Sequence, residues 1–351
     1  VTASLLQPLI GHVTDRHKLP WSLPAGMLCS LAGLLVIAMA PSYGVLLAGA
    51  MLLGVGSSIF HPESSRIARL ASGGRHGFAQ SLFQVGGNLG TSLGPLLAAF
   101  VVLPRGQGSL AWFAALALGG AVLQTYVARW YAALPPAPSK RAGTAGGAAA
   151  LGRGRIAGAL AVLIALVFSK YFYLASFSSY YAFYLMHRFG LSAERAQLGL
   201  FVFLGAVAVG TFAGGPIGDR MGRKRVIWFS IAGVLPFSLV LPHVGLGWTL
   251  ALSVVIGLVL SSAFSAIVVY ATELLPNRVG TVAGLFFGVA FGMGGLGAAV
   301  LGVLADARGI SFVYELCAFL PAIGMLAALL PDLDRPVSDR DPARAAGRRA
   351  A

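Results

Sequence analysis

The chain contains few charged residues for its length. Charged residues make up 10% of the 351 positions and hydrophobic residues 57%, whereas soluble domains carry roughly 25% charged residues. A soluble fold of this size could not bury so much apolar surface. The composition therefore excludes a water-soluble protein of two or three domains and indicates a polytopic membrane protein.

Cysteine is equally scarce. The two cysteines, Cys29 and Cys317, both lie inside apolar runs. A disulfide framework or a cysteine-based metal site needs more cysteines at a suitable spacing, so we expect two thiols that pack as small apolar groups. The sequence contains no H-E-x-x-H, G-x-S-x-G or P-loop pattern. We therefore expect neither an enzyme nor an ATP-driven pump, and no metal or cofactor.

Acidic residues are few, with 11 against 25 lysines and arginines, and the formal net charge is +14. In a soluble protein this excess could indicate nucleic-acid binding, but in a membrane protein basic residues gather in cytoplasmic loops. If the loop at 10–20 is cytoplasmic, 20 of the 25 basic residues fall on that side, four fall outside and Lys170 lies within a span. We therefore predict a multi-pass protein of the bacterial inner membrane without a nucleic-acid partner.

Continuous apolar runs recur along the whole chain, unlike the short alternating segments of a β-barrel. Val1 opens inside such a run, with no basic segment before it, so we expect a chain that lacks its first helix and part of its second. We predict eleven spans, the first of them partial: 1–10, 20–40, 43–70, 78–103, 109–131, 156–186, 194–217, 226–243, 247–271, 279–304 and 311–331.

The spans fall into two groups separated by a long polar gap. We predict an N-terminal bundle at 1–131 and a C-terminal bundle at 156–331. Between them, 132–155 is rich in Pro, Gly, Ala and basic residues, which is typical of a flexible cytoplasmic linker. The polar, Arg-rich segment 332–351 is predicted to be a disordered cytoplasmic tail.

The two groups resemble each other in sequence. The loop that starts at Gly11 matches the loop that starts at Gly215 at an offset of 204, and Arg75-His76-Gly77 matches Arg278-Val279-Gly280 at an offset of 203. Two parallel repeats joined by a cytoplasmic linker are typical of transporters whose substrate path lies between the halves, near the middle of the membrane.

The repeated loop G-x-x-x-D-R, followed in its second copy by a basic cluster, resembles the signature loop of the major facilitator superfamily. Segments 57–97 and 170–185 are similar to the fosmidomycin-resistance family within it. The resemblance implies an all-α fold of two six-helix repeats. It also implies a proton-coupled antiporter that exports small anionic or polar drugs such as fosmidomycin, an anionic phosphonate. A proton-coupled importer of an anionic metabolite is the alternative.

The implied partners are a small-molecule substrate, protons and the lipid bilayer, and we expect a monomer. The proton gradient takes the place of a cofactor as the driving force. The repeated loop favours a latch, because an Asp at a helix end can bind neighbouring helix N-termini and an Arg. The alternative is interfacial charge that only sets orientation. The latch residues are Gly11, Asp15, Arg16, Gly215, Asp219 and Arg220.

One span combines small residues, a proline and buried amides. Gly90-x-x-x-Gly94-Pro95 resembles the antiporter motif of drug exporters, although two alanines replace the glycine pair that closes that motif. Pro95 is expected to open the backbone ladder, and generic packing of small residues is the alternative interpretation. Gln84 and Asn88, four residues apart, share a helix face and predict either helix–helix hydrogen bonds or cavity lining.

Lys170 is the clearest charge inside a span. It lies 14 residues beyond Ile156, or roughly 21 Å along a helix at 1.5 Å per residue, and an ionisable group at that depth is a functional candidate. Tyrosines follow it, including Tyr173 and Tyr180. We predict that the ammonium and these hydroxyls hold an anionic headgroup. The alternative is a lysine paired with a structural carboxylate.

A second charged cluster lies toward the cytoplasmic end of the 43–70 span. His61 and Glu63 are two residues apart and so do not share a helix face, whereas Glu63 and Arg66 can pair. Glu273 holds the corresponding place in the second repeat. A carboxylate that is paired when dry and protonated when wet suits proton coupling, and an ion pair that caps the helix is the alternative.

Overall fold

The computed structural model describes residues 1–135 and 151–333. The linker and tail predictions that fall on 136–150 and 334–351 lie outside these residues. The described residues form helices and turns without a strand, so the prediction of an all-α protein is confirmed.

The first half of the chain consists of helices of different lengths that are joined by short loops. Its elements are α1 (Thr2–Arg16), α2 (Ser22–Ala38), α3 (Tyr43–Ala71), α4 (His76–Leu97), the π-helical turn η1 (Ala98–Val102), α5 (Leu103–Arg105), the 3-10 helix η2 (Gln107–Phe113) and α6 (Ala114–Ala133).

The second half begins with the longest helix. Its elements are α7 (Arg153–Phe189), α8 (Ala193–Met221), α9 (Arg223–Ala232), α10 (Leu235–Val240), η4 (Leu241–His243), α11 (Leu246–Ser261), α12 (Ala263–Leu274), α13 (Val279–Arg308), α14 (Ile310–Cys317) and η5 (Leu320–Leu329).

All eleven predicted spans coincide with a helix or a run of consecutive helical segments. Within the described ranges, eight of these are long and apolar enough to cross a bilayer, and α2 is shorter. Local sequence explains several ends. Ser192 accepts a hydrogen bond from Arg195 N at the start of α8, and Gly222 and Gly309 have positive φ between consecutive helices, where a side chain would be strained.

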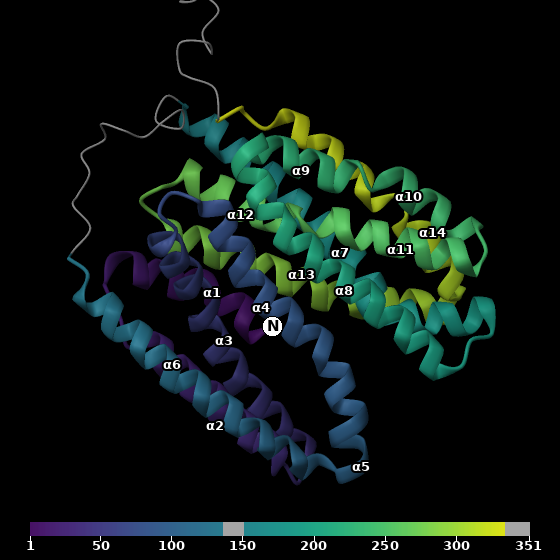
Figure 1. The fold of residues 1–351 in the computed structure, drawn as a ribbon, viewed down its shortest axis with the longest axis horizontal. Helices are drawn as coiled ribbons and strands as arrows, with labels where there is room; N and C mark the ends of the chain where they lie inside the picture. The colour runs from purple at the N-terminus through teal and green to yellow at the C-terminus, as the bar shows by residue number, and fades with distance from the viewer. Residues whose placement is uncertain (136–150, 334–351) are drawn as a thin grey trace, which may run out of the picture.

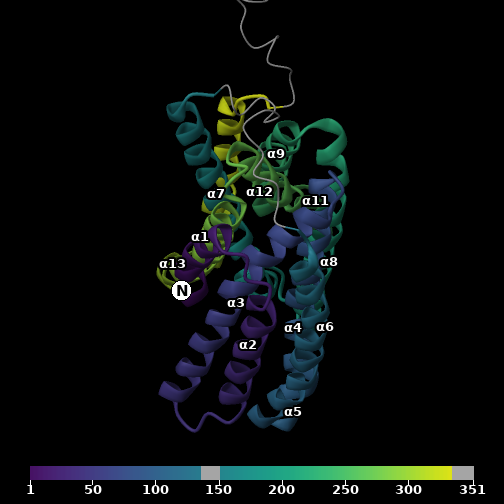
Figure 2. The same ribbon diagram turned by 90° about the vertical axis from the view of Figure 1, so that its left-hand side faces the viewer.

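The two halves form two bundles that meet mainly along two helix pairs. Within the first half α2 packs against α3 and α6, while α1 packs against α13 and α4 against α8 across the halves. Figures 1 and 2 show the first half in purple to blue and the second in teal to yellow. The two repeats therefore contact each other through corresponding helices, which places any path for a solute between them.

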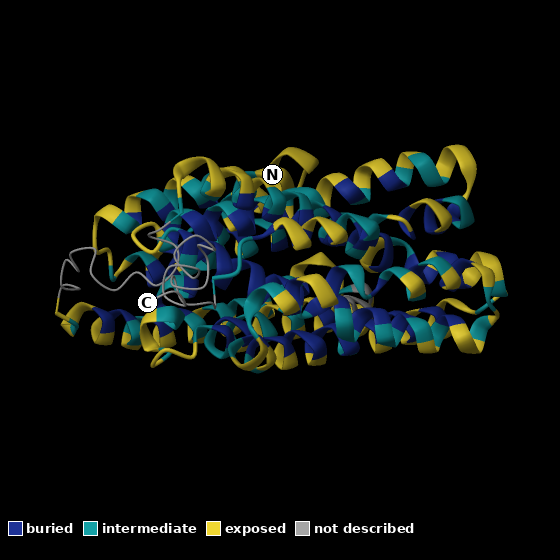
Figure 3. Ribbon diagram, turned by 90° about the horizontal axis from the view of Figure 1, so that it is seen from above, coloured by how far each residue is buried: buried dark blue, intermediate teal, exposed yellow. Residues whose placement is uncertain are grey.

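The larger core lies in the second half. Its biggest fully buried side chains lie on α7 and on the helices packed against it, and they include Phe177, Tyr181, Tyr184, Phe203 and Tyr314. In the first half, a small cluster of Leu23, Ile67 and Tyr131 is buried. Many large apolar side chains are exposed, as expected of helices that face lipid. Figure 3 shows the exposed positions in yellow.

The halves meet closely at the end that carries the repeated loops, here called the basic end, which the sequence predicts to be cytoplasmic. A Cβ on Gly11 would overlap the carbonyl of Gly280, and one on Gly215 would overlap the carbonyl of Gly77. At the opposite end, near α5, the two bundles lie apart (Figures 1 and 2). Glycine at these crossings lets the backbones approach closely, so the structure is closed at its basic end.

Candidate transport site

A cavity of about 350 Å³ lies between the two halves. This volume is at the lower end of the range for small-molecule sites. Its walls come from six helices, α1, α3, α4, α7, α12 and α13. The lining residues are Ala3, Ser57, His61, Phe83, Gln84, Gly87, Asn88, Thr91, Tyr171, Phe264, Phe287 and Phe291.

The two walls of this cavity differ in chemistry. The first half contributes hydroxyl, imidazole and amide groups together with one aromatic ring, that of Phe83, and the second half contributes four aromatic rings. Residues at equivalent positions of the two repeats show this difference. At the offset of 203, Gln84 and Asn88 of α4 correspond to Phe287 and Phe291 of α13. A solute with a polar end and an apolar body fits such a pair of walls.

His61 lies at the junction of the two walls. Its ring centroid is 5.2 Å from that of Phe287 and 4.9 Å from that of Phe291, both on the second half. Its Nδ1 lies 3.0 Å from the carbonyl oxygen of Ser57 and 3.2 Å from the Ser57 hydroxyl. These contacts fix the ring on the cavity wall. Among the cavity-lining residues of the described chain, His61 carries the one basic side chain.

Lys170 does not line the cavity but lies behind its aromatic wall. The side chain is 4% exposed, and its Nζ donates to the Ser261 carbonyl at 3.2 Å. The Nζ lies 5.5 Å from the Tyr171 ring centroid and 5.6 Å from that of Phe264. The ion pairs of the described chain do not include this ammonium. The ammonium is therefore one ring layer from the cavity, with a carbonyl and two π faces as its partners.

Glu63 points away from the cavity. It is fully buried and binds Arg66 through two bonds of 3.0 and 2.5 Å, and Arg66 also donates to the Tyr131 hydroxyl at 2.7 Å. Because successive helix residues turn by roughly 100°, residues two apart face opposite sides. The pair therefore joins α3 to α6 inside the first half.

The tyrosines predicted to surround a headgroup lie elsewhere. Tyr173 is buried in the core of the second half, with its ring 5.4 Å from that of Phe177. The Tyr180 hydroxyl donates to the Ala298 carbonyl of α13 at 2.5 Å. The expectation that these two rings line the site is not met, because only the face of α7 that carries Tyr171 borders the cavity.

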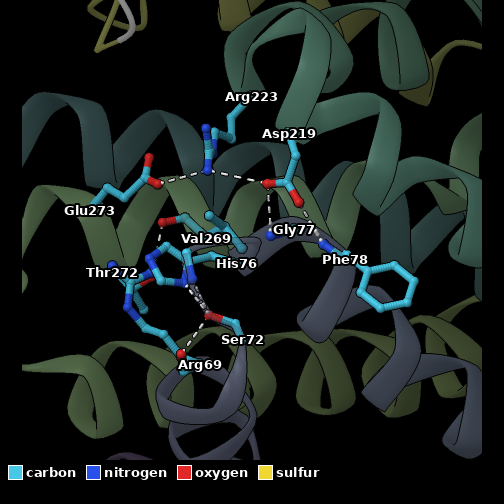
Figure 4. Close-up of polar contacts among 11 residues, drawn as sticks. Arg69, Ser72, His76, Gly77, Phe78, Asp219, Arg223, Val269, Thr272 and Glu273 are labelled. Carbon is cyan, nitrogen blue, oxygen red and sulfur yellow. Dashed lines mark hydrogen bonds and ion pairs between the residues drawn. The ribbon is translucent and has the colours of Figure 1, made fainter.

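The repeated loops make matching contacts between the halves. Asp15 accepts from Gly280 N, Thr281 N and the Thr281 hydroxyl, each at 2.7 Å. Asp219 accepts from Gly77 N and Phe78 N, both at 2.9 Å (Figure 4). Each carboxylate thus binds the N-terminus of a helix in the other half, where the helix dipole favours negative charge.

The cation at this contact is not the one that the motif indicates. Arg223 lies 3.3 Å from Asp219 and 3.1 Å from Glu273, so it joins α8 to α12 (Figure 4). Arg16 and Arg220, by contrast, are exposed. Glu273 therefore belongs to the basic end and not to the cavity. The basic cluster after the second loop is the signal that could have singled out Arg223.

The motif that resembles the antiporter motif lies in the C-terminal half of α4, shortly before the π-helical turn η1. It consists of Gly90, Gly94 and Pro95. A Cβ on Gly90 or Gly94 would meet no atom of the described residues within 4 Å. The small residues therefore make no close helix contact in this state. Asn88, two residues nearer the basic end than Gly90, donates to the Thr211 hydroxyl across the halves at 2.7 Å.

His76 stands at the start of α4, in the closed basic end. Burial, with the positive charges of Arg69 and Arg223 nearby, lowers the pKa of its imidazole from 6.5 to about 4, against the opposing effect of Asp219. The Ser72 hydroxyl lies 2.8 Å from its Nδ1 (Figure 4). The closed arrangement thus holds a neutral ring between two guanidinium groups.

We expect the closed basic end to open as the pH falls. A group whose pKa is lowered in the closed state stabilises that state fully above pH 6.5 and loses this contribution progressively toward pH 4. Distances between spin labels at the basic end should therefore lengthen between about pH 7.5 and 4.5, and less so at high salt. His76→Asn should remove most of this change. An equal change in that variant would contradict the assignment to His76.

The described arrangement is that of an all-α membrane transporter, closed at one end around a cavity between two related halves. The Major Facilitator Superfamily model matches residues 1–296 and 163–351. The chain therefore belongs to the Major Facilitator Superfamily. It is a multi-pass protein of the bacterial inner membrane.

Two curated relatives cover most of the chain. The sequence is 58% identical over 332 residues to the fosmidomycin resistance protein of Escherichia coli (strain K12), covering 95% of this chain and 82% of that protein. It is 41% identical over 335 residues to an uncharacterized MFS-type transporter of Bacillus subtilis (strain 168), covering 94% and 81%. The resemblance inferred from residues 57–97 and 170–185 is confirmed.

Solved structures share the fold at low identity. The Major Facilitator Superfamily transporter FucP in the outward conformation aligns with a TM-score of 0.70 and 15% identity, covering 93% of this chain and 87% of that one. The human organic anion transporter MFSD10 aligns with a TM-score of 0.70 and 20% identity, covering 94% and 81%. These structures establish the fold.

Proposed function

We propose that the protein exports small anionic or polar compounds, with fosmidomycin as the example, through the cavity between its halves. The observation that carries the proposal is the cavity itself, with one mainly polar wall, one aromatic wall and an ammonium behind the aromatic wall. The name of the E. coli relative supports export, because a transporter confers resistance by lowering the concentration of the drug inside the cell.

The positive charge behind the rings supports an anionic cargo. Lys170 is not a member of any ion pair in the described ranges, so its field reaches the cavity through Tyr171 and Phe264. An anionic head near these rings would supply the missing counter-charge, and the rings would cover an apolar body. Gln84, Asn88 and Thr91 would offer hydrogen bonds from the opposite wall.

The driving force in this proposal is the proton gradient. One proton that enters down a potential of about 150 mV supplies roughly 3.5 kcal/mol, enough for a gradient of about 300-fold. His61 is the proton site that the geometry supports best, since Glu63 is bound to Arg66 away from the cavity. A cargo body that displaces water from His61 removes the hydration that an imidazolium needs, and so favours loss of the proton.

We expect fosmidomycin binding to release a proton from His61. In weakly buffered solution at mildly acidic pH, binding to the purified protein should release less than one proton per drug, and His61→Gln should release none. Glu63→Gln is the matched control, because the Glu63 carboxylate lies in the same helix but outside the cavity, so we expect normal proton release from this variant. Proton release that persists in His61→Gln would exclude this residue as the proton site.

A second candidate, a proton-coupled importer of an anionic metabolite, is favoured by the chemistry of the same residue. If the anionic head contacts His61 directly, the imidazolium attracts it, and proton and anion bind together. Binding would then take up protons. In whole cells an importer should sensitise the cell to fosmidomycin, whereas an exporter should protect it. Everted vesicles that accumulate the drug, and lose this on addition of an uncoupler, would support proton-coupled export.

A further inference from the structure

Two polar stripes run from the cavity to the basic end on neighbouring helices. Both stripes have a spacing of four residues, which keeps each on one helix face. The α3 stripe consists of Ser57, His61, Ser65 and Arg69, and the α4 stripe of His76, Gln80, Gln84 and Asn88.

The stripes pair in antiparallel register. The Ser65 hydroxyl donates to Gln80 Oε1 at 2.7 Å. One step toward the cavity, His61 and Gln84 lie on the same wall. One step toward the basic end, Arg69 and His76 line a second, small cavity. Ser65 and Gln80 line the same cavity. We call these eight residues the polar ladder.

The ladder belongs to the first half alone. At the offset of 203, Gln80, Gln84 and Asn88 correspond on α13 to Ala283, Phe287 and Phe291, which are apolar. The same packing between halves is therefore possible without polar groups, and packing does not explain the ladder.

Parts of the ladder are poorly satisfied while the basic end is closed. Gln80 Nε2 and Gln84 Nε2 are buried, with no hydrogen-bond partner among the described residues. The Arg69 guanidinium donates to the Thr272 hydroxyl of α12 at 2.9 Å, across the halves (Figure 4). Buried donors without acceptors are costly, so these groups gain partners when water or a solute reaches them.

Opening the basic end would expose the ladder. The helices that cover it, α12 and α13, belong to the other half, and alternating access moves one half against the other. Thr272 would then leave Arg69. Glu273, the acidic residue whose charge acts on Arg69, is bound by Arg223 at 3.1 Å. The guanidinium fork would be available to a carboxylate or a phosphonate.

We propose that Arg69 is an anion-capture site at the basic end, from which the cargo passes along the polar ladder to the central cavity. The ligand class is a small carboxylate, phosphate or phosphonate. This site rests on the proposed export function and adds to it the step by which cargo is loaded from the cytoplasm. The central cavity would receive the cargo only afterwards.

The test compares two variants that break the same hydrogen bond from opposite sides. Arg69→Gln removes the charge, whereas Thr272→Val removes only its partner in the closed state. With labelled fosmidomycin and everted vesicles, whose cytoplasmic face is outside, Arg69→Gln should raise KM about tenfold. Thr272→Val should leave KM within about twofold. Arg69→Lys should restore part of the loss, and immunoblots should show equal amounts of each variant.

The outcomes separate this site from the function on which it rests. Vesicles with the unaltered protein that take up no fosmidomycin would contradict the export function itself. Uptake that depends on Lys170 but shows an unchanged KM in Arg69→Gln would overturn the capture site alone. Equal effects of Arg69→Gln and Thr272→Val, without rescue by Arg69→Lys, would also overturn it, because they would assign Arg69 to closure of the basic end.

Discussion

Replacing Lys170 with Met is expected to abolish fosmidomycin resistance in cells that depend on this protein. The variant keeps a long, flexible side chain in a site that is 4% exposed, so packing should change little. It removes the charge behind Tyr171 and Phe264. At an effective dielectric constant of about 20, two unit charges roughly 8 Å apart attract each other by about 2 kcal/mol, so we expect cargo binding to weaken by roughly 30-fold.

Lys224 provides the matched control for this variant. Its Nζ also donates to backbone carbonyls, those of Ala328 at 2.9 Å and Leu330 at 2.5 Å, but at the basic end. Lys224→Met should therefore cost some stability and leave cargo binding intact. Both variants would be compared by drug resistance, membrane abundance and direct uptake. Wild-type uptake by Lys170→Met at normal abundance would remove the ammonium from the transport site.

Helical spacing in the sequence predicts which residues share a helix face, but it does not predict which face borders the cavity. The spacing of Gln84 and Asn88 predicted a shared face, and both residues line the cavity. The spacing of His61 and Glu63 predicted opposite faces, and only His61 reaches the cavity. Which of two opposite faces borders a cavity depends on how the helix is rotated against its neighbours, and one span alone does not encode that rotation.

The same limit explains the tyrosines after Lys170. A helix rich in aromatic residues on every side gives no signal about which ring faces a cavity and which ring faces a core. In the structure Tyr171 borders the cavity, whereas Tyr173 packs within the second half. The repeat holds more information than the single helix, since the offset of 203 already aligns the amides of α4 with the rings of α13.

The two halves thus share the contacts that close the basic end but differ in the residues that line the cavity. The contacts that close the basic end are repeated, with one carboxylate from each half on a helix of the other. The cavity walls and the polar ladder are not repeated. Symmetric contacts suit a movement that rocks two similar bundles, whereas recognition of a solute with two unlike ends needs unlike walls.

Replacing both Asp15 and Asp219 with Asn is expected to shift the protein away from the state closed at its basic end. Each carboxylate accepts two backbone N–H bonds from the other half, and Asp15 accepts a hydroxyl as well. An Asn keeps one acceptor oxygen but turns an NH2 group toward the second N–H donor, and it loses the attraction of the helix dipole.

At about 2 kcal/mol for each replacement, and with the two sites independent, the closed state would lose roughly 4 kcal/mol, or about 700-fold in population. Spin labels at the basic end should report longer distances in the double variant than in either single variant. Replacing the exposed Arg16 and Arg220 with Ala should leave these distances unchanged. Because transport needs both states, the double variant should still bind fosmidomycin from the cytoplasmic side but export it slowly. Rapid export by the double variant would show that the two carboxylates do not hold the basic end shut.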